Sequence, residues 1–473
     1  MADRTTLEEK RLLVLWRLSW PAIMEQLLSM LVSYADTAMV GALGSDATAA
    51  VSVVSSSIWT VGGILAGIGV GYSVQVANAV GARDDRKARR VIRQGALAVM
   101  VVAWFHIWQQ SWLYPGFDLF GRHINLDPLV RSGYIWVDIM ILISGFCHYL
   151  PWARMQDGDR MPSPLDFYAR RMFRIHPSYL LTIAVMFAVA LATGAYGSAA
   201  HMRLDLLSHL TYTHTFFYNA YYASNLGGAL WTLAIELQFY LIFPWLAREF
   251  RRSPVMTFLA MVFCSLGFRA WVGANYADVS MFFNQLPAYL DTFALGMAGA
   301  VIHCRLAGRR HTPLSRIVCS AMCVVVMALL WRVVKGQAAL PGVEAIRIGQ
   351  MNNRLAMGML GCALLVFSAN AGLVVRRIFS NPLTRFVSAV SMQFYIWHQT
   401  IAVWLLRSRV IPSEAENPNY EGDLRWQVLF TIACFAVSFA VSALLTYGFE
   451  RPAARWLQRR WDAWRAGRRE TGE

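Results

Sequence analysis

The sequence has few charged residues for its length. Only 15% of its 473 residues are charged, whereas 57% are hydrophobic, and the mean hydropathy is +0.41. Soluble globular chains carry about a quarter charged residues, so this chain lacks the polar surface that water requires. The composition excludes a soluble enzyme, a disordered scaffold and a small secreted disulfide domain. It indicates an integral membrane protein.

Cysteine is also scarce, and the seven cysteines all lie in or beside apolar segments. None of them stands at metal-ligand spacing from a histidine, so we expect structural thiols and no metal site. The net charge of +15 would suggest nucleic acid as the partner of a soluble chain. Here the cationic residues fall between apolar runs, so we expect them to orient the chain in a lipid bilayer and to bind no nucleic acid.

Apolar runs long enough to cross a bilayer recur along the whole chain. A transmembrane helix needs about 20 apolar residues. The sequence predicts an all-α fold of about 12 spans, near residues 15–40, 47–76, 93–113, 132–150, 178–197, 229–247, 254–273, 286–304, 315–334, 354–372, 386–406 and 426–448.

Basic residues mark one side of these spans. With a cytoplasmic N-terminus, most of the 43 Lys and Arg residues fall in the inside segments, such as the clusters at 83–93, 154–174 and 305–316. Because cytoplasmic loops carry an excess of Lys and Arg, both termini are predicted to be cytoplasmic. Segment 198–228 is then the longest external loop. Its His and Tyr residues either meet a sugar-like acceptor or form an interfacial aromatic belt, and the belt is the favoured interpretation.

Ionisable residues inside a bilayer are costly and therefore candidates for function. His106 and His398 each lie 13 residues beyond a basic residue, roughly 20 Å from the cytoplasmic edge by helical rise. Asp138 and Glu236 lie roughly 10 Å from the outer ends of their spans by the same measure. Four helices are thus predicted to bring ionisable groups to one level. The alternative for each residue is a buried polar group that a neighbouring helix satisfies. Two further acidic residues, Glu25 and Asp36, lie in the first span.

A cluster of arginines stands at the cytoplasmic face. Arg170, Arg171 and Arg174 precede the span near 178–197, and Pro177 is expected just before its first turn. Positive charge on the inner side accounts for one or two of them. Three guanidinium groups on adjacent helix faces also suit a phosphate-bearing ligand that is bound bidentately.

From about Val99 to Ala463, six short motifs occur in order with apolar spans between them. They are FH at 105–106, VDIMILISGF at 137–146, F-x-x-R-R-x-x-R-I-x-P at 167–177, LWTLAIELQFYLIFP at 230–244, S-x-x-x-Y-I-W-H at 391–398 and FERP at 449–452. Together they resemble the acyltransferase-3 family of ten-span membrane O-acyltransferases. The resemblance implies transfer of an acyl group from cytoplasmic acyl-CoA (acetyl-CoA or succinyl-CoA) to a hydroxyl of an envelope glycan or small glycoside.

The resemblance also implies roles for particular residues. His106 matches the family's essential histidine and is expected to act as general base, with Glu236 or Asp138 orienting its imidazole. The phosphates of CoA are expected at the arginines of the third motif, Arg170, Arg171 and Arg174. The substrate is expected at Trp231, Tyr240, Tyr395 and His398. The sequence departs from the family pattern at Gly95, where an arginine is usual.

The first hundred residues resemble a different family. The runs LWRLSWPAI at 15–23, ADTAMVGALG at 35–44 and VANAVGARDDRKARR at 76–90 are similar to the opening of a multidrug and toxic compound extrusion (MATE) transporter. Asp36 matches a first-helix aspartate that is tied to cation coupling in part of that family. The expected domains are a truncated MATE-like pair of helices at 1–98, an acyltransferase domain at 99–463 and a basic cytoplasmic tail at 464–473.

The predicted protein is therefore a multi-pass enzyme of a bacterial-type inner (plasma) membrane, an acyltransferase for groups other than aminoacyl groups. The alternative is a MATE-type drug or cation antiporter fragment, or a transporter of glycan or acyl groups without transferase activity. A MATE protein needs a second extrusion-like half after residue 200, and acyltransferase motifs occupy that stretch instead.

Overall fold

The computed structural model describes residues 86–470, apart from 157–158, 160, 308–311 and 379–380. The two N-terminal predicted spans, with Glu25 and Asp36, lie outside the described residues. The predicted boundary between residues 98 and 99 falls inside a continuous helix, α3 (Arg86–Ser111). The predicted start of the tail at 464 likewise falls inside α17 (Arg451–Glu470).

Each of the ten predicted spans within the described residues coincides with a helix. Besides α3, these are α5 (Val137–Ala153), α6 (Pro164–Ala192), α9 (Leu230–Arg252), α10 (Pro254–Asn275), α11 (Leu290–Ala307), α12 (Pro313–Ala338), α13 (Gly342–Asn370), α15 (Pro382–Ser408) and α16 (Leu424–Leu445). Short elements join them: α4 (Asp127–Arg131), α14 (Leu373–Ile378), the 3₁₀ turns η1 (Gly133–Trp136) and η3 (Leu286–Tyr289), and the π-helical turn η4 (Thr446–Glu450) between α16 and α17.

Six helices in the described part of the chain are long and apolar enough to cross a membrane. They are Gly133–Ala153, Pro164–Ala192, Leu230–Arg252, Pro254–Asn275, Pro313–Ala338 and Leu424–Gly467. The protein is therefore a multi-pass membrane protein, and its residues from 86 onward, where described, are helical apart from one short hairpin. Helices α11, α13 and α15 bury Asp291, Arg354 and His398 against other helices, which agrees with an interior position in the bundle. The counts of ten and twelve spans stay predictions.

The sequence analysis did not predict two local features. A two-stranded antiparallel hairpin, β1 (Gly116–Leu119) with β2 (Arg122–Asn125), follows α3, so the chain is not purely helical. Segment 198–228, which the charge pattern predicts to be external, is folded into α7 (Ala199–Leu210), η2 (His214–Phe216) and α8 (Tyr218–Tyr222). The hairpin is short and strongly exposed, and two four-residue strands have little hydrophobic periodicity by which to be recognised.

The predicted helix start at residue 178 is wrong. Helix α6 begins at Pro164, because the Ser163 side chain accepts a hydrogen bond from the Asp166 amide and Pro164 occupies the first turn. Pro177 lies inside the helix rather than before it. A membrane helix tolerates an internal proline when neighbouring helices satisfy the freed backbone groups. The arginine motif consequently lies on the first three turns of α6 itself.

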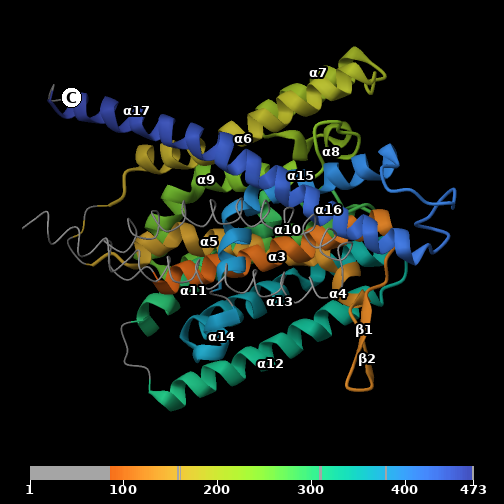
Figure 1. The fold of residues 1–473 in the computed structure, drawn as a ribbon. Coiled ribbons are helices and arrows are strands. Elements are labelled where there is room, and N and C mark those ends of the chain that lie inside the picture. Colours follow the sequence, from red (N-terminus) through yellow and green to blue (C-terminus); the bar gives the residue numbers. More distant parts are fainter. Residues whose placement is uncertain (1–85, 157–158, 160, 308–311, 379–380, 471–473) are drawn as a thin grey trace, which may run out of the picture. The chain divides into compact units, whose positions relative to one another are not determined.

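The helices divide into central and peripheral ones. Helices α5 and α9 are mostly buried, whereas α10, α12 and the long 424–467 helix are mostly exposed and carry apolar side chains outward. Figure 1 shows α3, α5, α11 and α13 side by side at the centre, as their contacts require. An exposed apolar surface of this extent is unsuited to water, so the peripheral faces are the ones that lipid would cover.

Close backbone contact holds α5 against α11. A methyl group on Gly296 would collide with the Leu142 carbonyl and the Phe146 amide, and one on Gly145 would collide with the Phe293 carbonyl. Small residues at such crossings let two membrane helices approach closely, and dispersion contacts then hold them together. This crossing fixes the position of Asp138 and Ser144, which lie on α5.

We expect Gly296→Ala to destabilise the protein by about 1–3 kcal/mol or more, because the methyl group forces α5 and α11 apart. Gly336→Ala is the matched control: a Cβ there meets nothing within 4 Å, and the change should be neutral or stabilise by up to about 1 kcal/mol. Thermal unfolding of both variants in detergent measures the difference. Equal melting temperatures for the two would contradict the close crossing.

Candidate active site

Two histidines from different helices form the centre of the site. The Nδ1 atom of His106 on α3 lies 2.7 Å from the Nε2 atom of His398 on α15, and the two rings stack with centroids 5.0 Å apart. His398 is fully buried, whereas His106 is partly exposed. The sequence placed both residues at the same depth, and the structure brings them into contact.

The partners of the two rings define where the protons sit. The Nδ1 atom of His398 lies 3.0 Å from the Phe394 carbonyl, which can only accept a hydrogen bond. Nδ1 of a neutral His398 therefore carries the proton, and its Nε2 is an acceptor. It follows that Nδ1 of His106 donates to His398 and that Nε2 of His106 keeps a lone pair. An imidazole held in this tautomer is oriented to accept a proton.

A second group of polar residues adjoins the pair on α9 and α5. Tyr395, one turn before His398, makes a side-chain hydrogen bond with Thr232. Glu236, one turn further along α9, accepts hydrogen bonds from the Ser144 hydroxyl of α5 and from Tyr240. The predicted stripe of Thr232, Glu236 and Tyr240 therefore faces other helices rather than lipid. Glu236 is bonded to Ser144 and not to the imidazole of His106.

His148, which the sequence analysis did not single out, lies in this group. Its Nδ1 atom lies 2.5 Å from the Ser144 carbonyl, and its ring packs among aromatic rings, with centroids 4.7 Å from Tyr240 and 5.8 Å from Phe167. Phe167 in turn lies under the guanidinium group of Arg171, 5.7 Å from its ring centroid. Aromatic side chains thus connect the arginine motif to the group around Glu236.

Asp138 was expected beside the histidine and instead belongs to a buried ionic cluster. Its carboxylate accepts a hydrogen bond from Nε of Arg354, at 3.1 Å, and both side chains are fully buried. The guanidinium group also stacks on Tyr289, 3.6 Å from the ring centroid. Next to it Arg269 pairs with Asp291 at 2.6 Å. The reason is electrostatic: two buried acids and two buried arginines neutralise one another, which a lone buried carboxylate could not achieve.

The remaining predicted residues occupy distinct places. Trp231 lies near the ionic cluster, with its ring 6.2 Å from that of Tyr289. Arg170 and Arg174 are exposed and Arg171 is partly exposed. Arg170 lies 4.0 Å from Asp166, whose carboxylate also binds Arg465 and the indole of Trp461 from α17. Helix α17 therefore packs beside the arginine motif.

Gly95, the position that departs from the family pattern, lies on α3 against α5. A Cβ atom there would lie 3.5 Å from Ile143. A side chain at this position points at an apolar neighbour, so the glycine belongs to the packing of α3 on α5. The seven cysteines are free thiols, and in the described part of the chain no group of three or more His, Cys, Asp or Glu residues could hold a metal ion.

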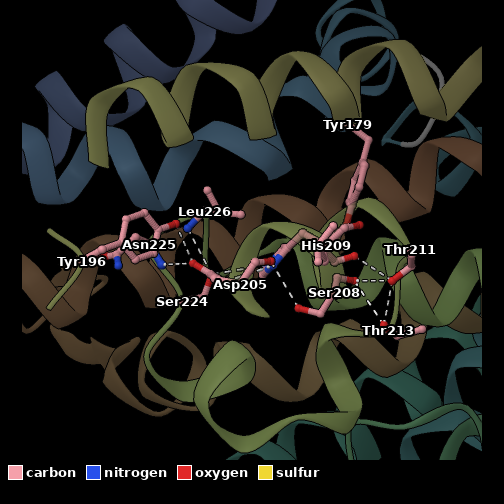
Figure 2. Close-up of polar contacts among 11 residues, drawn as sticks. Tyr179, Tyr196, Asp205, Ser208, His209, Thr211, Thr213, Ser224, Asn225 and Leu226 are labelled. Atoms are coloured by element: carbon pink, nitrogen blue, oxygen red, sulfur yellow. Dashed lines mark hydrogen bonds and ion pairs between the residues drawn. The ribbon is translucent and has the colours of Figure 1, made fainter. Parts of the chain in front are cut away.

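Segment 198–228 has its own buried polar cluster. His209 and His214 stack in parallel with centroids 3.9 Å apart. Asp205 accepts hydrogen bonds from the Tyr196 hydroxyl and from the backbone N–H of Asn225 (Figure 2). Ser224 lies 3.4 Å from Nε2 of His209. The Nδ1 atom of His209 lies closest to the backbone carbonyl of Asp205, at 2.8 Å. The cluster therefore ties the segment together, while aromatic residues such as Phe216 and Tyr218 are exposed.

Fold and site together define a multi-pass membrane enzyme. A family model described as "Acyltransferase domain" matches residues 95–447, most of the chain, and the chain belongs to this acyltransferase family. A second model, described as MatE, matches residues 21–123 and overlaps the first. The N-terminal MATE segment that the sequence motifs predict is thus confirmed.

The chain is similar to several curated proteins over part of its length. It is 30% identical to Nodulation protein 10 of Rhizobium leguminosarum bv. viciae over 203 residues, which cover 40% of this chain and 51% of that protein. It is 28% identical to the O-acetyltransferase OatA of Staphylococcus aureus (strain NCTC 8325 / PS 47) over 196 residues, 38% of this chain and 32% of that protein. The chain spans about half the length of the first of these. No solved structure matches it.

We expect Asp138→Asn and Arg354→Met each to destabilise the protein by about 3–5 kcal/mol, because each change leaves the other group buried without its partner. The double variant should recover most of that loss. Unfolding of the three variants in detergent measures the coupling. If Asp138→Asn abolished activity at unchanged stability, the carboxylate would act in catalysis and the structural role would be wrong.

The external cluster is expected to loosen in mild acid. Burial lowers the pKa of His214 well below its ordinary value, and the neighbouring His209 lowers it further. Below pH about 6.5, His214 takes up a proton in the unfolded segment but stays neutral in the folded one. The free energy that favours the folded segment therefore decreases as the pH falls. Hydrogen exchange of residues 205–226 at pH 7.5 and pH 5.5 measures this. His214→Phe should remove the pH effect and His123→Phe, on the exposed hairpin, should not; an equal response in all three proteins would contradict it.

Proposed function

We propose that the protein transfers an acyl group from cytoplasmic acyl-CoA, such as acetyl-CoA or succinyl-CoA, to a hydroxyl group of an envelope glycan or small glycoside. The membrane would be a bacterial inner membrane. The observation that carries the proposal is the hydrogen bond between His106 and His398, because it leaves Nε2 of His106 as a proton acceptor inside a family of acyltransferases. The name of the similar S. aureus O-acetyltransferase is consistent with a hydroxyl acceptor.

In the proposed reaction His106 is the general base. Its Nε2 atom takes the proton of the acceptor hydroxyl while that oxygen attacks the thioester carbon. The carbon–sulfur bond then breaks, and the imidazolium returns the proton to the departing thiolate of CoA. The products are an ester and free CoA. A positioned base of this kind contributes roughly 10²–10⁴-fold in rate.

His398 is the positioning residue in this account. As His106 gains a proton at Nε2, its Nδ1–H becomes a stronger donor, and the neutral Nε2 of His398 accepts from it. His398 itself is oriented by the Phe394 carbonyl one turn earlier on α15. His398 thus has the role of the carboxylate in a Ser-His-Asp triad, because it holds the His106 ring in one tautomer and one orientation. Glu236 and Asp138 do not orient the base directly in this account. Glu236 accepts a hydrogen bond from Ser144, and Asp138 accepts one from Arg354.

The arginine motif supports a cytoplasmic donor. Arg170, Arg171 and Arg174 lie on the first turns of α6, at the end that the charge pattern predicts to be cytoplasmic. Planar guanidinium groups that are at least partly exposed can bind phosphate bidentately. The long flexible arm of CoA would extend from there past Phe167 and Tyr240 toward the histidines. Tyr395 and Trp231 would contact substrate on the far side.

We expect His106→Ala to lower kcat at least 100-fold, since it removes the base. His398→Phe should lower kcat about 10- to 100-fold with little change in KM, because the His106 ring loses the acceptor that holds its tautomer, and the acid limb of the pH profile should shift. His398→Gln, whose amide oxygen can accept the same hydrogen bond, should recover part of the rate. Acetyl transfer from radiolabelled acetyl-CoA to membrane glycan measures these rates. Full activity of His398→Phe at wild-type stability would overturn the positioning role.

A further inference from the structure

A polar cavity of about 470 Å³ lies at the ends of α3 and α15, beyond the histidine pair. Gln109 and Gln110 line it from α3, Leu406 and Arg409 from the end of α15, and Trp426 from α16. The connection between α15 and α16 supplies the rest through residues 411–413 and 415–420. Gln110 stands four residues after His106, which is about 6 Å of helical rise. The cavity therefore begins one helical turn beyond the proposed base, toward the C-terminal end of α3. The charge pattern predicts that this end of α3 faces away from the cytoplasm, whereas the arginine motif is predicted to face it.

The cavity wall is held in place by hydrogen bonds between elements. The Asn419 side chain donates to the Gln110 carbonyl at 3.2 Å, and Gln427 of α16 donates to the Asn419 carbonyl at 3.0 Å. The ring of Tyr420 lies 5.6 Å from that of Trp112 at the end of α3. The connection is thus anchored to both α3 and α16, and the cavity is a built feature of the fold.

Backbone strain is concentrated at the same place. Among the described residues four non-glycine residues have positive φ, and two of them, Trp112 (φ 54°) and Arg409 (φ 47°), end the two helices that meet at this cavity. A left-handed backbone conformation is unfavourable for a residue with a Cβ atom, and strain of this kind gathers at ligand sites. The Arg409 guanidinium donates to the Glu416 carbonyl at 3.2 Å, so it is used to shape the wall.

The chemistry of the lining selects a neutral ligand rich in hydroxyl groups. Gln109, Gln110 and Asn417 present amide groups, which both donate and accept hydrogen bonds, and none of these three side chains bonds another described residue. One cation and one carboxylate, Arg409 and Glu416, leave no net charge to attract an ion. Tyr420 offers an exposed aromatic ring on which an apolar sugar face can stack. The volume lies within the roughly 300–1,000 Å³ that is typical of small-molecule sites.

We infer that this cavity is the saccharide site that presents the acceptor hydroxyl to His106. The inference rests on the proposed acyl transfer and names the acceptor class and the residues that bind it. One or two sugar rings would bind to the amides and Tyr420, and one hydroxyl would extend along α3 to the lone pair of His106. The connection 411–420 would then determine which saccharide is accepted.

The kinetic test uses the full chain with acetyl-CoA and a panel of methyl glycosides of glucose, galactose and N-acetylglucosamine. Gln110→Leu and Asn417→Ala should each raise the acceptor KM about 5- to 10-fold and leave the acetyl-CoA KM unchanged. Glu414→Ala is the matched control, because Glu414 lies in the same connection without lining the cavity, and its acceptor KM should stay within about 2-fold of wild type. An unchanged acceptor KM in both cavity variants would overturn the inference.

A binding test separates this inference from the proposed reaction. Saturation-transfer NMR of the same glycosides with the purified chain, without acyl-CoA, should give signals for wild type and Glu414→Ala that are lost in Gln110→Leu and Asn417→Ala. Such a result without any transfer would uphold the site and contradict the proposed function. If no glycoside binds, or if all four proteins bind equally, the saccharide site is wrong. Wild-type melting temperatures in the variants exclude misfolding as the cause.

Discussion

One hydrogen bond, between Nδ1 of His106 and Nε2 of His398, is the constraint on which the rest of this site depends. It joins α3 to α15, and it forms when Nδ1 of His106 carries a proton and Nε2 of His398 does not. The Phe394 carbonyl sets this arrangement of protons from within α15. A backbone group therefore decides which nitrogen of His106 can accept a proton, and no charged residue has to enter the centre of the bundle to do it.

The charges that the bundle does contain are kept apart from the histidines. Asp138 and Arg354 neutralise each other, and Arg269 and Asp291 repeat the arrangement beside them. Such a cluster contributes little net stability when intact and is costly to break, so its effect is to hold the helices in one arrangement. The close α5–α11 crossing, which glycines permit, positions the same helix that presents Ser144 to Glu236. Packing and electrostatics therefore both position α5, whose Ser144 hydroxyl donates a hydrogen bond to Glu236 of α9.

The positions of the long helices could be predicted from the sequence, but the way in which they pack against one another could be predicted only in part. Each of the ten apolar runs within the described residues coincides with a helix, and depth along a helix placed His106 and His398 together. Depth along a helix does not give the direction in which a side chain points around the helix axis. Depth alone therefore predicted Asp138 beside the two histidines, whereas its carboxylate faces Arg354. Including cations within spans, Arg269 and Arg354, would have supplied the missing partners. The polar cavity could not be predicted as a whole, because Gln109 and Gln110 lie on α3 but Asn417 and the rest of its wall lie in a connection without periodicity.

The central claim is the tautomer of His106, and ¹⁵N NMR of histidine-labelled protein in lipid nanodiscs tests it directly. Resonances are assigned by their loss in His106→Ala and His398→Ala. The account predicts that both rings are neutral and carry the proton on Nδ1, with Nε2 of His106 unprotonated at neutral pH. A His106 ring protonated at Nε2, or a doubly protonated ring, would contradict it.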